Sequence, residues 1–209
     1  MPLDITQAAT WYRKAANKGN AAAQFNVGRL YEHGWGVQQD YVQAAHWYQK
    51  AAEQGDALAE SRLALLFYSG RGVPNDYAQA ALWYRKAAEQ GFSEAQFNLG
   101  GMYFSGKGVP EDLSQAAMWF RKAADQCDSD AQLFLGTMYA QGHGFPQDYA
   151  KAYFWFDLAA ACKVDATHPE IVAQNRKTAA SHLTPAELSR AQQQVRKWAE
   201  DHGFTKPAQ

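Results

Sequence analysis

Large aromatic and small apolar residues recur along the chain at one fixed interval. Tryptophan stands at every 36th position from residue 11 onward: Trp11, Trp47, Trp83, Trp119 and Trp155. Alanines follow each of them four and five positions later: Ala15 and Ala16, Ala51 and Ala52, Ala87 and Ala88, Ala123 and Ala124, Ala159 and Ala160. A second column keeps the same register: Val27, Leu63, Leu99 and Leu135. A period of this length indicates a protein built from stacked structural repeats.

Within one period the apolar positions predict two helices. Ala23, Val27 and Tyr31 are spaced four apart and form one stripe of a helix over residues 21–32, which we name helix A. Ala44, Trp47 and Ala51 lie on one line of the next helix, which we name helix B. The alanines allow neighbouring helices to approach closely around the large aromatic ring.

The segments between the two helices carry turn and capping residues. Glycine pairs end each helix A: Gly34 and Gly36, Gly70 and Gly72, Gly106 and Gly108, Gly142 and Gly144. An aspartate stands where each helix B begins: Asp40, Asp76, Asp112 and Asp148. The glycine pairs do not fit a phosphate-binding loop, because a helix rather than a strand precedes them. The chain is therefore predicted to be all-α, a solenoid of antiparallel helix pairs.

One unit carries a family resemblance in three segments. Residues 95–103 (AQFNLGGMY), 106–112 (GKGVPED) and 116–124 (AAMWFRKAA) resemble the Sel-one-like repeat family, a relative of the tetratricopeptide repeats. The resemblance covers residues 4–163, with departures at Ala64 and Cys127, where the pattern has glycine. It implies a right-handed superhelix of paired antiparallel helices that serves mostly as an adaptor for other proteins.

The repeat register predicts the domain organisation. We expect an N-terminal half repeat at 4–19, four full repeats at 20–55, 56–91, 92–127 and 128–163, and a C-terminal helical cap at 164–209. In the last helix B, Leu158 stands where earlier repeats have lysine, and Ala161 stands where they have a polar residue. Both positions are therefore expected to be interior, covered by the cap.

The cap is predicted to contain two helices. One is expected to start at a capping box of Thr167 and Glu170. The other starts at Thr184, with proline at its first position and Glu187 three residues on, and it places Leu188, Ala191, Val195 and Trp198 on one face.

At the other end, the helix over residues 4–18 has no helix A before it. It repeats the apolar pattern that elsewhere faces two neighbours, so Trp11 is expected to be part of an exposed apolar edge. Either the natural chain continues upstream, which the lack of a cap-like segment before Asp4 favours, or this edge associates with another molecule, for instance a second copy. The first four residues lack the basic and apolar regions of a signal peptide, and the compartment stays open.

Composition and charge narrow the classes of partner. The chain has 209 residues, 47% of them hydrophobic, which is enough for a continuous core. Twenty Lys and Arg residues against 21 Asp and Glu residues give a net charge of -1, which argues against a nucleic-acid partner. We expect no membrane insertion, since no apolar run approaches the roughly 20 residues that span a bilayer. A ladder of lysines follows helix B: Lys14, Lys50, Lys86 and Lys122. Cations at helix C-termini complement the helix dipole, which makes the ladder structural.

The sequence offers no cofactor site and little support for catalysis. The six histidines have no metal-ligand spacing, and no serine has a lysine three residues later. Cysteine-rich relatives in the family imply one alternative, a hydrolase or accessory subunit acting on cell-wall, glycan or β-lactam substrates. That function would need a converging carboxylate pair, for which Glu32, Glu94 and Asp130 are the candidates. We expect a protein that is not an enzyme.

Two cysteines, Cys127 and Cys162, are separated by 35 residues, one short of the period. Layers of helices pack about 10 Å apart, whereas a disulfide needs Cα atoms within about 7 Å. Two free thiols are therefore expected.

Helix A lines the concave face in the tetratricopeptide class, so its positions outside the core stripe are the binding candidates. They vary from repeat to repeat and combine polar with apolar side chains: Asn26, Arg29, Arg62, Leu65, Tyr68, Asn98 and Phe104. Arginine can bind carboxylates bidentately, and aromatic residues are typical of interface hot spots. Four repeats at about 10 Å would form a groove of about 40 Å, which accommodates an extended peptide of roughly 12 residues. The predicted function is a non-enzymatic scaffold that binds a protein or peptide.

Overall fold

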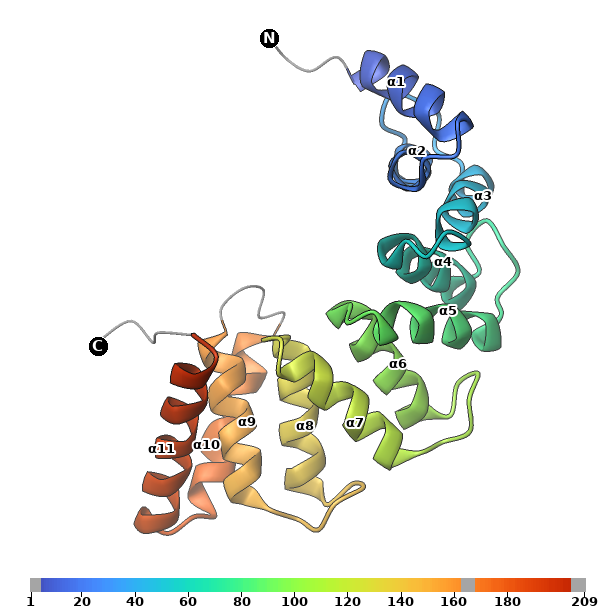
Figure 1. Ribbon diagram of the computed structural model, residues 1–209. Helices are drawn as coiled ribbons and strands as arrows, with labels where there is room; N and C mark the ends of the chain where they lie inside the picture. The colour runs from blue at the N-terminus through green and yellow to red at the C-terminus, as the bar shows by residue number, and fades with distance from the viewer. Residues whose placement is uncertain (1–4, 163–167, 204–209) are drawn as a thin grey trace. The chain divides into compact units, whose positions relative to one another are not determined.

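The computed structural model describes residues 5–162 and 168–203, and in these ranges it contains helices and no strands. The helices are α1 (Ile5–Asn17), α2 (Ala21–His33), α3 (Tyr41–Ala52), α4 (Ala57–Ser69), α5 (Tyr77–Glu89), α6 (Ser93–Ser105), α7 (Leu113–Ala124), α8 (Ser129–Gln141), α9 (Tyr149–Ala161), α10 (Pro169–Ser181) and α11 (Pro185–Asp201) (Figure 1). The all-α architecture expected from the period is confirmed.

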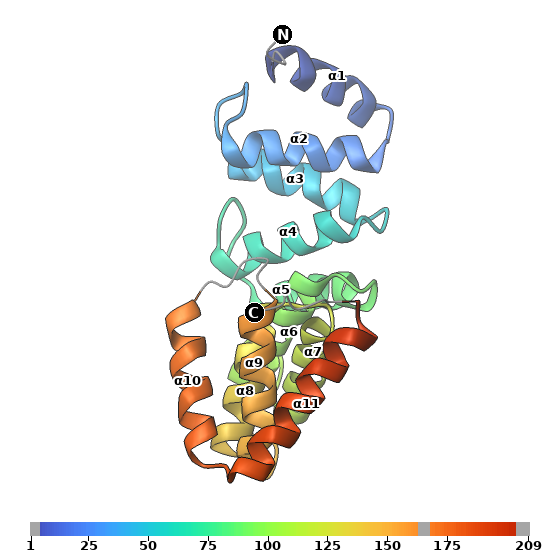
Figure 2. The ribbon, with the colours of Figure 1, turned by 90° about the vertical axis from the view of Figure 1, so that its left-hand side faces the viewer.

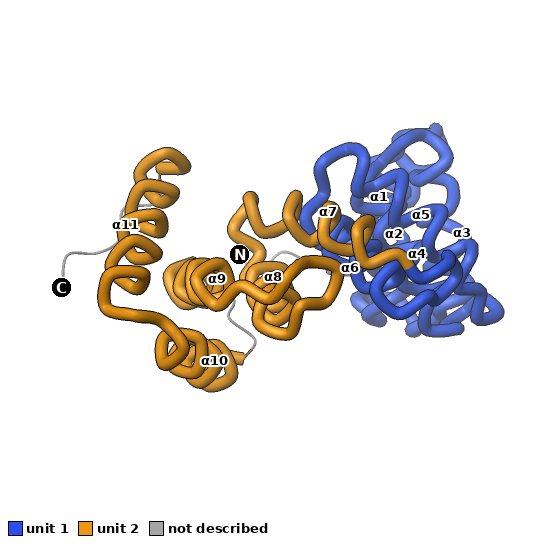
Figure 3. The backbone as a smooth tube through the Cα atoms, turned by 90° about the horizontal axis from the view of Figure 1, so that it is seen from below, with its two compact units in different colours: residues 1–111 blue, residues 112–209 orange. Residues whose placement is uncertain are grey.

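Successive helices pack as antiparallel pairs. Helix A packs on the helix B that follows it in three pairs: α2 with α3, α4 with α5 and α8 with α9 (Figure 2). The chain forms two compact units, residues 1–111 with α1–α6 and residues 112–209 with α7–α11 (Figure 3). Each unit is described below by itself.

The ends of the helices follow the predicted capping residues. The aspartate before each helix B accepts backbone N–H hydrogen bonds from the first turn, as Asp40 does from Val42 and Gln43 at 2.9 and 3.0 Å. The first glycine of each pair ends helix A in the left-handed conformation. The second glycine has another role: a Cβ on Gly108 would lie 2.1 Å from the carbonyl oxygen of Tyr77. Only glycine lets this turn approach the start of the preceding helix B.

The alanine columns and the repeated tryptophan form the core. Ala44, Ala80, Ala116 and Ala152 are fully buried. The exposed fraction of the tryptophan is 69% for Trp11 on α1 but 9% for Trp83, 4% for Trp119 and 1% for Trp155. Among the described residues α1 packs against α2, and Trp11 lies on its exposed side.

A column of buried glutamines joins successive helices. Gln24, Gln96 and Gln132 each donate from Nε2 to the carbonyl oxygen eight residues earlier, at 3.2, 3.0 and 2.9 Å. The second repeat has Glu60 in this column, and its carboxylate accepts a 2.8 Å hydrogen bond from Gln90. Burial raises the pKa of Glu60 above its ordinary value, and the hydrogen bond from Gln90 opposes that rise.

Helices α10 and α11 both pack against α9, on either side of it (Figure 3). Leu158 is 1% exposed, as expected for a covered position, and Arg176 of α10 pairs with the buried Asp157 at 2.8 Å. The prediction for Ala161 is wrong: it is exposed at the last position of α9, as is Ala160 before it.

The starts of the cap helices are confirmed in one case only. α11 begins with the reciprocal hydrogen bonds of Thr184 and Glu187. α10 begins at Pro169 with His168 as its N-cap, and no side chain caps it, while Thr167 lies outside the described residues.

The expectation of two free thiols is wrong. Cys127 and Cys162 form a disulfide, and their Cα atoms lie 5.6 Å apart. The layer distance that excluded this bond applies along the bodies of helices, whereas both cysteines lie just beyond helix ends. Cys127 follows α7 with φ of 65°, at the position where the earlier repeats have a left-handed glycine, and Cys162 is the C-cap of α9. The disulfide ties the ends of two successive helices B together.

Candidate functional site

The seven predicted groove residues lie on the three helices A of the first unit. Asn26 and Arg29 are on α2, Leu65 is on α4 and Phe104 is on α6, and the remaining positions of the set, Arg62, Tyr68 and Asn98, lie on the same helices. All seven are half-buried. We name this surface of α2, α4 and α6 the helix-A face.

An acid–phenol pair stands beside the two arginines. The hydroxyl of Tyr48, on α3, donates to the Glu32 carboxylate on α2. Burial raises the pKa of Tyr48 well above its ordinary value and Glu32 raises it further, whereas the positive charges of Arg62 and Arg29 lower it. Both guanidinium groups therefore act on this pair, Arg29 from α2 and Arg62 from α4.

A second polar group follows in the next repeat. Arg62 on α4 pairs with Glu94 on α6, with Nη2 and Oε2 3.9 Å apart. Burial raises the pKa of Tyr84, the counterpart of Tyr48, and the Glu94 carboxylate raises it further, while Arg62 lowers it. The Arg62–Glu94 pair is partly exposed, so it contributes little to stability and its charges remain accessible to a ligand.

Tyr68 lies near the C-terminal end of α4, at the edge of the face next to the glycine turn. Its hydroxyl accepts a 3.2 Å hydrogen bond from Lys107, and its ring meets the Tyr77 ring edge-on with centroids 5.2 Å apart. The bond to Tyr68 raises the pKa of Lys107, which stays protonated. The Tyr68 ring is therefore held in place before any ligand binds.

The other polar residues of the set are oriented by local contacts. Asn26 and Asn98 each donate to a carbonyl oxygen of their own helix at 2.9 Å. The Arg29 guanidinium lies over the rings of Phe25 and Trp35, at 5.9 and 5.4 Å from their centroids. Trp35 is 44% exposed, so this cation–aromatic contact extends the face into the first glycine turn.

Sequence reasoning did not identify the buried Tyr48 and Tyr84 as polar groups next to this face, or the exposed Trp35 as part of it. One signal was present: the column that contains Tyr48 and Tyr84 has Phe120 and Phe156 in the last two full repeats. A hydroxyl that appears in only part of a core column indicates a polar partner nearby. Nothing comparable marked Trp35, whose position varies freely between the glycines.

The lysine ladder has a structural explanation. Each ammonium nitrogen lies over the ring of the tryptophan three residues before it, at 4.8 Å for Lys14, 4.9 Å for Lys50, 3.9 Å for Lys86 and 4.2 Å for Lys122. The lysine side chains thus cover the tryptophans on the helix-B side.

The candidate acids of the alternative function have other partners. Glu32 accepts the Tyr48 hydroxyl, and Glu94 pairs with Arg62. Asp130 lies on α8 of the second unit. Over residues 5–162 and 168–203, no group of His, Cys, Asp and Glu could hold a metal ion, and no helix is long and apolar enough to cross a bilayer. The arrangement of donors, acceptors and aromatic rings suits hydrogen bonding to a polypeptide.

Comparisons with known proteins agree with this architecture. The Sel1 repeat model matches residues 1–20, 21–56, 57–92, 93–126 and 129–164. A Sel1 repeat protein from Oxalobacter formigenes is 37% identical with a TM-score of 0.76, and the match covers 93% of this chain and 80% of that chain. A protective antigen of uropathogenic Escherichia coli with an SLR fold is 30% identical with a TM-score of 0.56, over 95% of this chain and 57% of the antigen.

A more distant structural neighbour is an immunity protein from Pseudomonas aeruginosa, at 19% identity and a TM-score of 0.51, over 90% of this chain and 75% of that one. At this identity the likeness shows a shared fold alone. A search of curated proteins found no match.

Proposed function

The chain belongs to the Sel1 repeat family, and from this premise we propose that it is a non-enzymatic scaffold that binds a peptide or protein partner on the helix-A face of its first unit. The carrying observation is the composition of that face. Side chains that hydrogen-bond polypeptides, such as Arg29 and Arg62, alternate there with half-buried Leu65 and Phe104.

The variation of these residues from repeat to repeat supports a role in binding rather than in folding. Core columns keep closely similar residues, such as alanine in the column of Ala44 and Val or Leu in the column of Val27, whereas the column of Arg29 contains Leu65, Gly101 and Thr137. A side chain that packs the core cannot change this much without loss of stability. Positions on the face are therefore free to match a ligand.

The face has the dimensions of a short peptide site. At the usual spacing of about 10 Å between helix layers, three helices A would span about 20 Å, which corresponds to roughly six residues of extended chain. The tethered rings of Tyr68 and Trp35 lie on glycine-turn edges of this span. Because their orientations are already restricted, a partner would lose less entropy on binding them.

A photo-crosslinking experiment tests this assignment. Benzoylphenylalanine in place of Leu65 reports on the helix-A face, and the same group in place of Leu82, which is 46% exposed on α5, is the matched control. Irradiation in an extract of the native organism is expected to give discrete adducts with the variant at position 65. The variant at position 82 is expected to give none of these adducts. The same adducts at both positions, or adducts at position 82 alone, would place the partner elsewhere.

We also propose that the α1 edge mediates self-association. Trp11 is 69% and Tyr12 is 40% exposed on the same helix, an apolar surface that an inner repeat would cover. A second copy supplies a matching surface through a two-fold axis. Light scattering is expected to show a concentration-dependent dimer that Trp11→Ser abolishes, and a wild type that stays monomeric at high concentration would contradict the proposal.

A further inference from the structure

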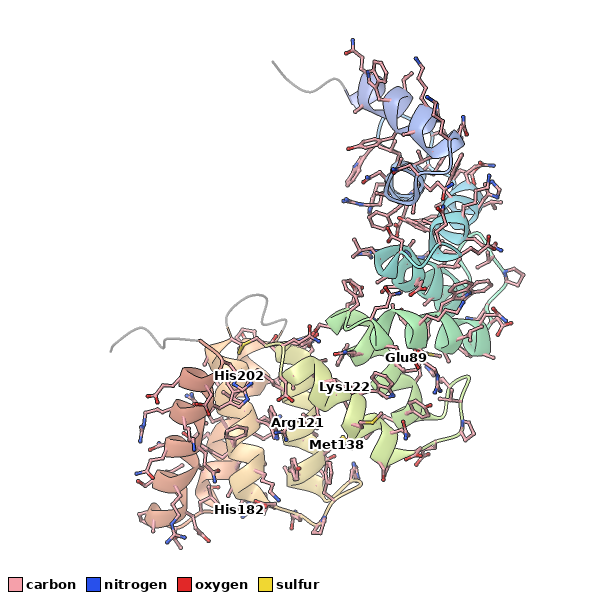
Figure 4. The ribbon with its side chains drawn as sticks, viewed as in Figure 1. Glu89, Arg121, Lys122, Met138, His182 and His202 are labelled. Atoms are coloured by element: carbon pink, nitrogen blue, oxygen red, sulfur yellow. A yellow bond between two sulfur atoms is a disulfide. The ribbon has the colours of Figure 1, made fainter. Side chains whose placement is uncertain are left out.

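The disulfide of the second unit joins a half-buried residue to a buried one. Cys127, in the turn after α7, is half-buried, whereas Cys162 at the end of α9 is only 5% exposed. Figure 4 draws the side chains of this unit, with a disulfide as a yellow bond. A reagent in solution therefore approaches the bond more readily through Cys127 than through Cys162.

A buried glutamine contacts the inner sulfur. Gln132 on α8 is fully buried, and its Nε2 donates to the carbonyl oxygen of Ala124 at 2.9 Å and to Cys162 Sγ at 3.5 Å. Its Oε1 is buried as well, and within residues 5–162 and 168–203 no donor reaches it. A buried amide oxygen without a donor is unfavourable. The disulfide form of the protein therefore has an unsatisfied acceptor beside the bond.

The earlier repeats show which donor this acceptor lacks. In the first full repeat, Gln54 donates from Nε2 to the Oε1 of Gln24 at 2.7 Å. In the second, Gln90 donates to the carboxylate of Glu60 at 2.8 Å. Cys162 stands in the column of Gln54 and Gln90. A disulfide sulfur has no hydrogen to donate, whereas a thiol is a weak donor. Reduction would therefore give this position a donor for the unsatisfied oxygen.

We propose that the Cys127–Cys162 bond is a thiol–disulfide exchange site for small thiols, with Gln132 as its positioning residue. The thiolate of the small thiol attacks Cys127 Sγ and forms a mixed disulfide there, while the Cys127–Cys162 bond breaks. The electron pair of that bond stays on Cys162 Sγ, where the Nε2–H of Gln132 stabilises the negative charge until water supplies a proton.

The new thiol of Cys162 then donates to the Oε1 of Gln132, which satisfies the acceptor. A second small thiolate attacks its own kind of sulfur in the mixed disulfide and releases Cys127, which takes a proton from water. The products are two protein thiols and the disulfide of the small thiol, so the small thiol supplies both electrons. The amide of Gln132 thus favours opening, and the closure of the loop between the cysteines opposes it.

Mass spectrometry of the folded wild type tests the direction of attack and needs no variant. The probe is 2-mercaptoethanol, a neutral thiol, because Asp125 and Asp128 flank Cys127 in the chain and would repel an anionic one. Samples of an opening time course are quenched in acid, unfolded and alkylated. The probe is expected on Cys127 and the alkyl group on Cys162. The reverse assignment, no adduct at any time, or opening no faster than unfolding in urea extrapolated to water would overturn the exchange site.

Paired variants test the role of Gln132. Gln132→Met removes the amide beside Cys162. Gln96→Met removes the equivalent amide of the first unit, which donates to the carbonyl oxygen of Ala88 at 3.0 Å, whereas both cysteines belong to the second unit. Each variant loses one hydrogen bond between successive helices, so a purely structural role would affect both alike.

The readouts are the equilibrium of the bond in mixtures of 2-mercaptoethanol and its disulfide, and the rate of opening. Gln132→Met is expected to shift the equilibrium toward the Cys127–Cys162 bond by roughly fivefold or more, and to slow opening by a similar factor. Gln96→Met is expected to leave both within about twofold of the wild type. A shift toward the thiols or no shift in Gln132→Met, or equal shifts in both variants, would overturn the role of Gln132.

Discussion

The Cys127–Cys162 disulfide gives a prediction whose size follows from the chain topology. The bond closes a segment with a sequence separation of 35 that contains all of α8 and α9. Opening it by Cys162→Ala frees this loop in the unfolded chain and leaves Cys127 in the left-handed conformation. The variant Cys127→Gly also opens the loop but restores the residue that earlier repeats carry at this position.

The loop-entropy relation for a closed segment of this length corresponds to about 4 kcal/mol at 25 °C. Glycine at a left-handed position recovers up to about 1 kcal/mol relative to a residue with a side chain. We therefore expect Cys162→Ala to lower the free energy of unfolding by about 4 kcal/mol and Cys127→Gly by about 3 kcal/mol. With an m-value of about 2 to 3 kcal/mol per molar urea, the larger loss shifts the midpoint by about 1.3 to 2 M.

Urea unfolding followed by circular dichroism, with and without a reductant, measures these differences. Without reductant the wild type should be the most stable of the three, and with reductant its midpoint should fall to within about 0.5 M of that of Cys162→Ala. Thiol titration of the unfolded, unreduced wild type should find no free thiol. Two titratable thiols per chain, or a wild-type midpoint that does not respond to reductant, would refute the disulfide.

Two further predictions concern the core. Trp83→Ala should lower the free energy of unfolding by about 3 to 5 kcal/mol, the usual range for a buried aromatic residue. Trp11→Ala, at the exposed equivalent position, should lower it by under about 1 kcal/mol. Equal losses in urea melts would mean that the tryptophan column is not graded in burial. Because burial raises the pKa of Glu60, the fold favours its protonated form, and this group contributes most to stability below its ordinary pKa of 4.5 and loses that contribution as the pH rises. Glu60→Gln should therefore stabilise the protein by about 1 kcal/mol at pH 7, and the gain should disappear below pH 4.5; a gain independent of pH in thermal melts would contradict this reasoning.

Most of the fold could be predicted from the repeat period. Spacing alone identified both helices of each unit, the capping aspartates and the left-handed glycines, because these depend on residues close in sequence. The predictions that were wrong, for the two cysteines and for Ala161, depended on exact positions at helix ends. The distance between layers did not exclude the disulfide, since Cys127 and Cys162 lie beyond the helices, and Ala161 lies past the covered part of α9.

The candidate site was predictable in outline and not in its contacts. Columns of equal register placed Arg29, Arg62 and Tyr68 on one kind of helix, because repeats preserve the direction of a side chain. The hydrogen bond between Tyr48 and Glu32 joins two helices, and the repeat register does not predict which side chains of two helices meet. The contact of Gln132 with Cys162 in the second unit could not be predicted either, since the spacing of the two cysteines argued against their disulfide.

The most direct test of the central claim is the affinity of the crosslinked partner, once purified, for the wild type and two double variants. Calorimetric titration should show that Arg62→Ala with Tyr68→Ala weakens binding by about 2 kcal/mol or more, roughly 30-fold, with little change in melting temperature. Lys50→Ala with Lys86→Ala, which removes two cations from the tryptophan rings of the helix-B side, should leave the affinity unchanged. An equal or greater loss in the lysine variant, with full affinity in the Arg62 and Tyr68 variant, would contradict the assignment of the helix-A face.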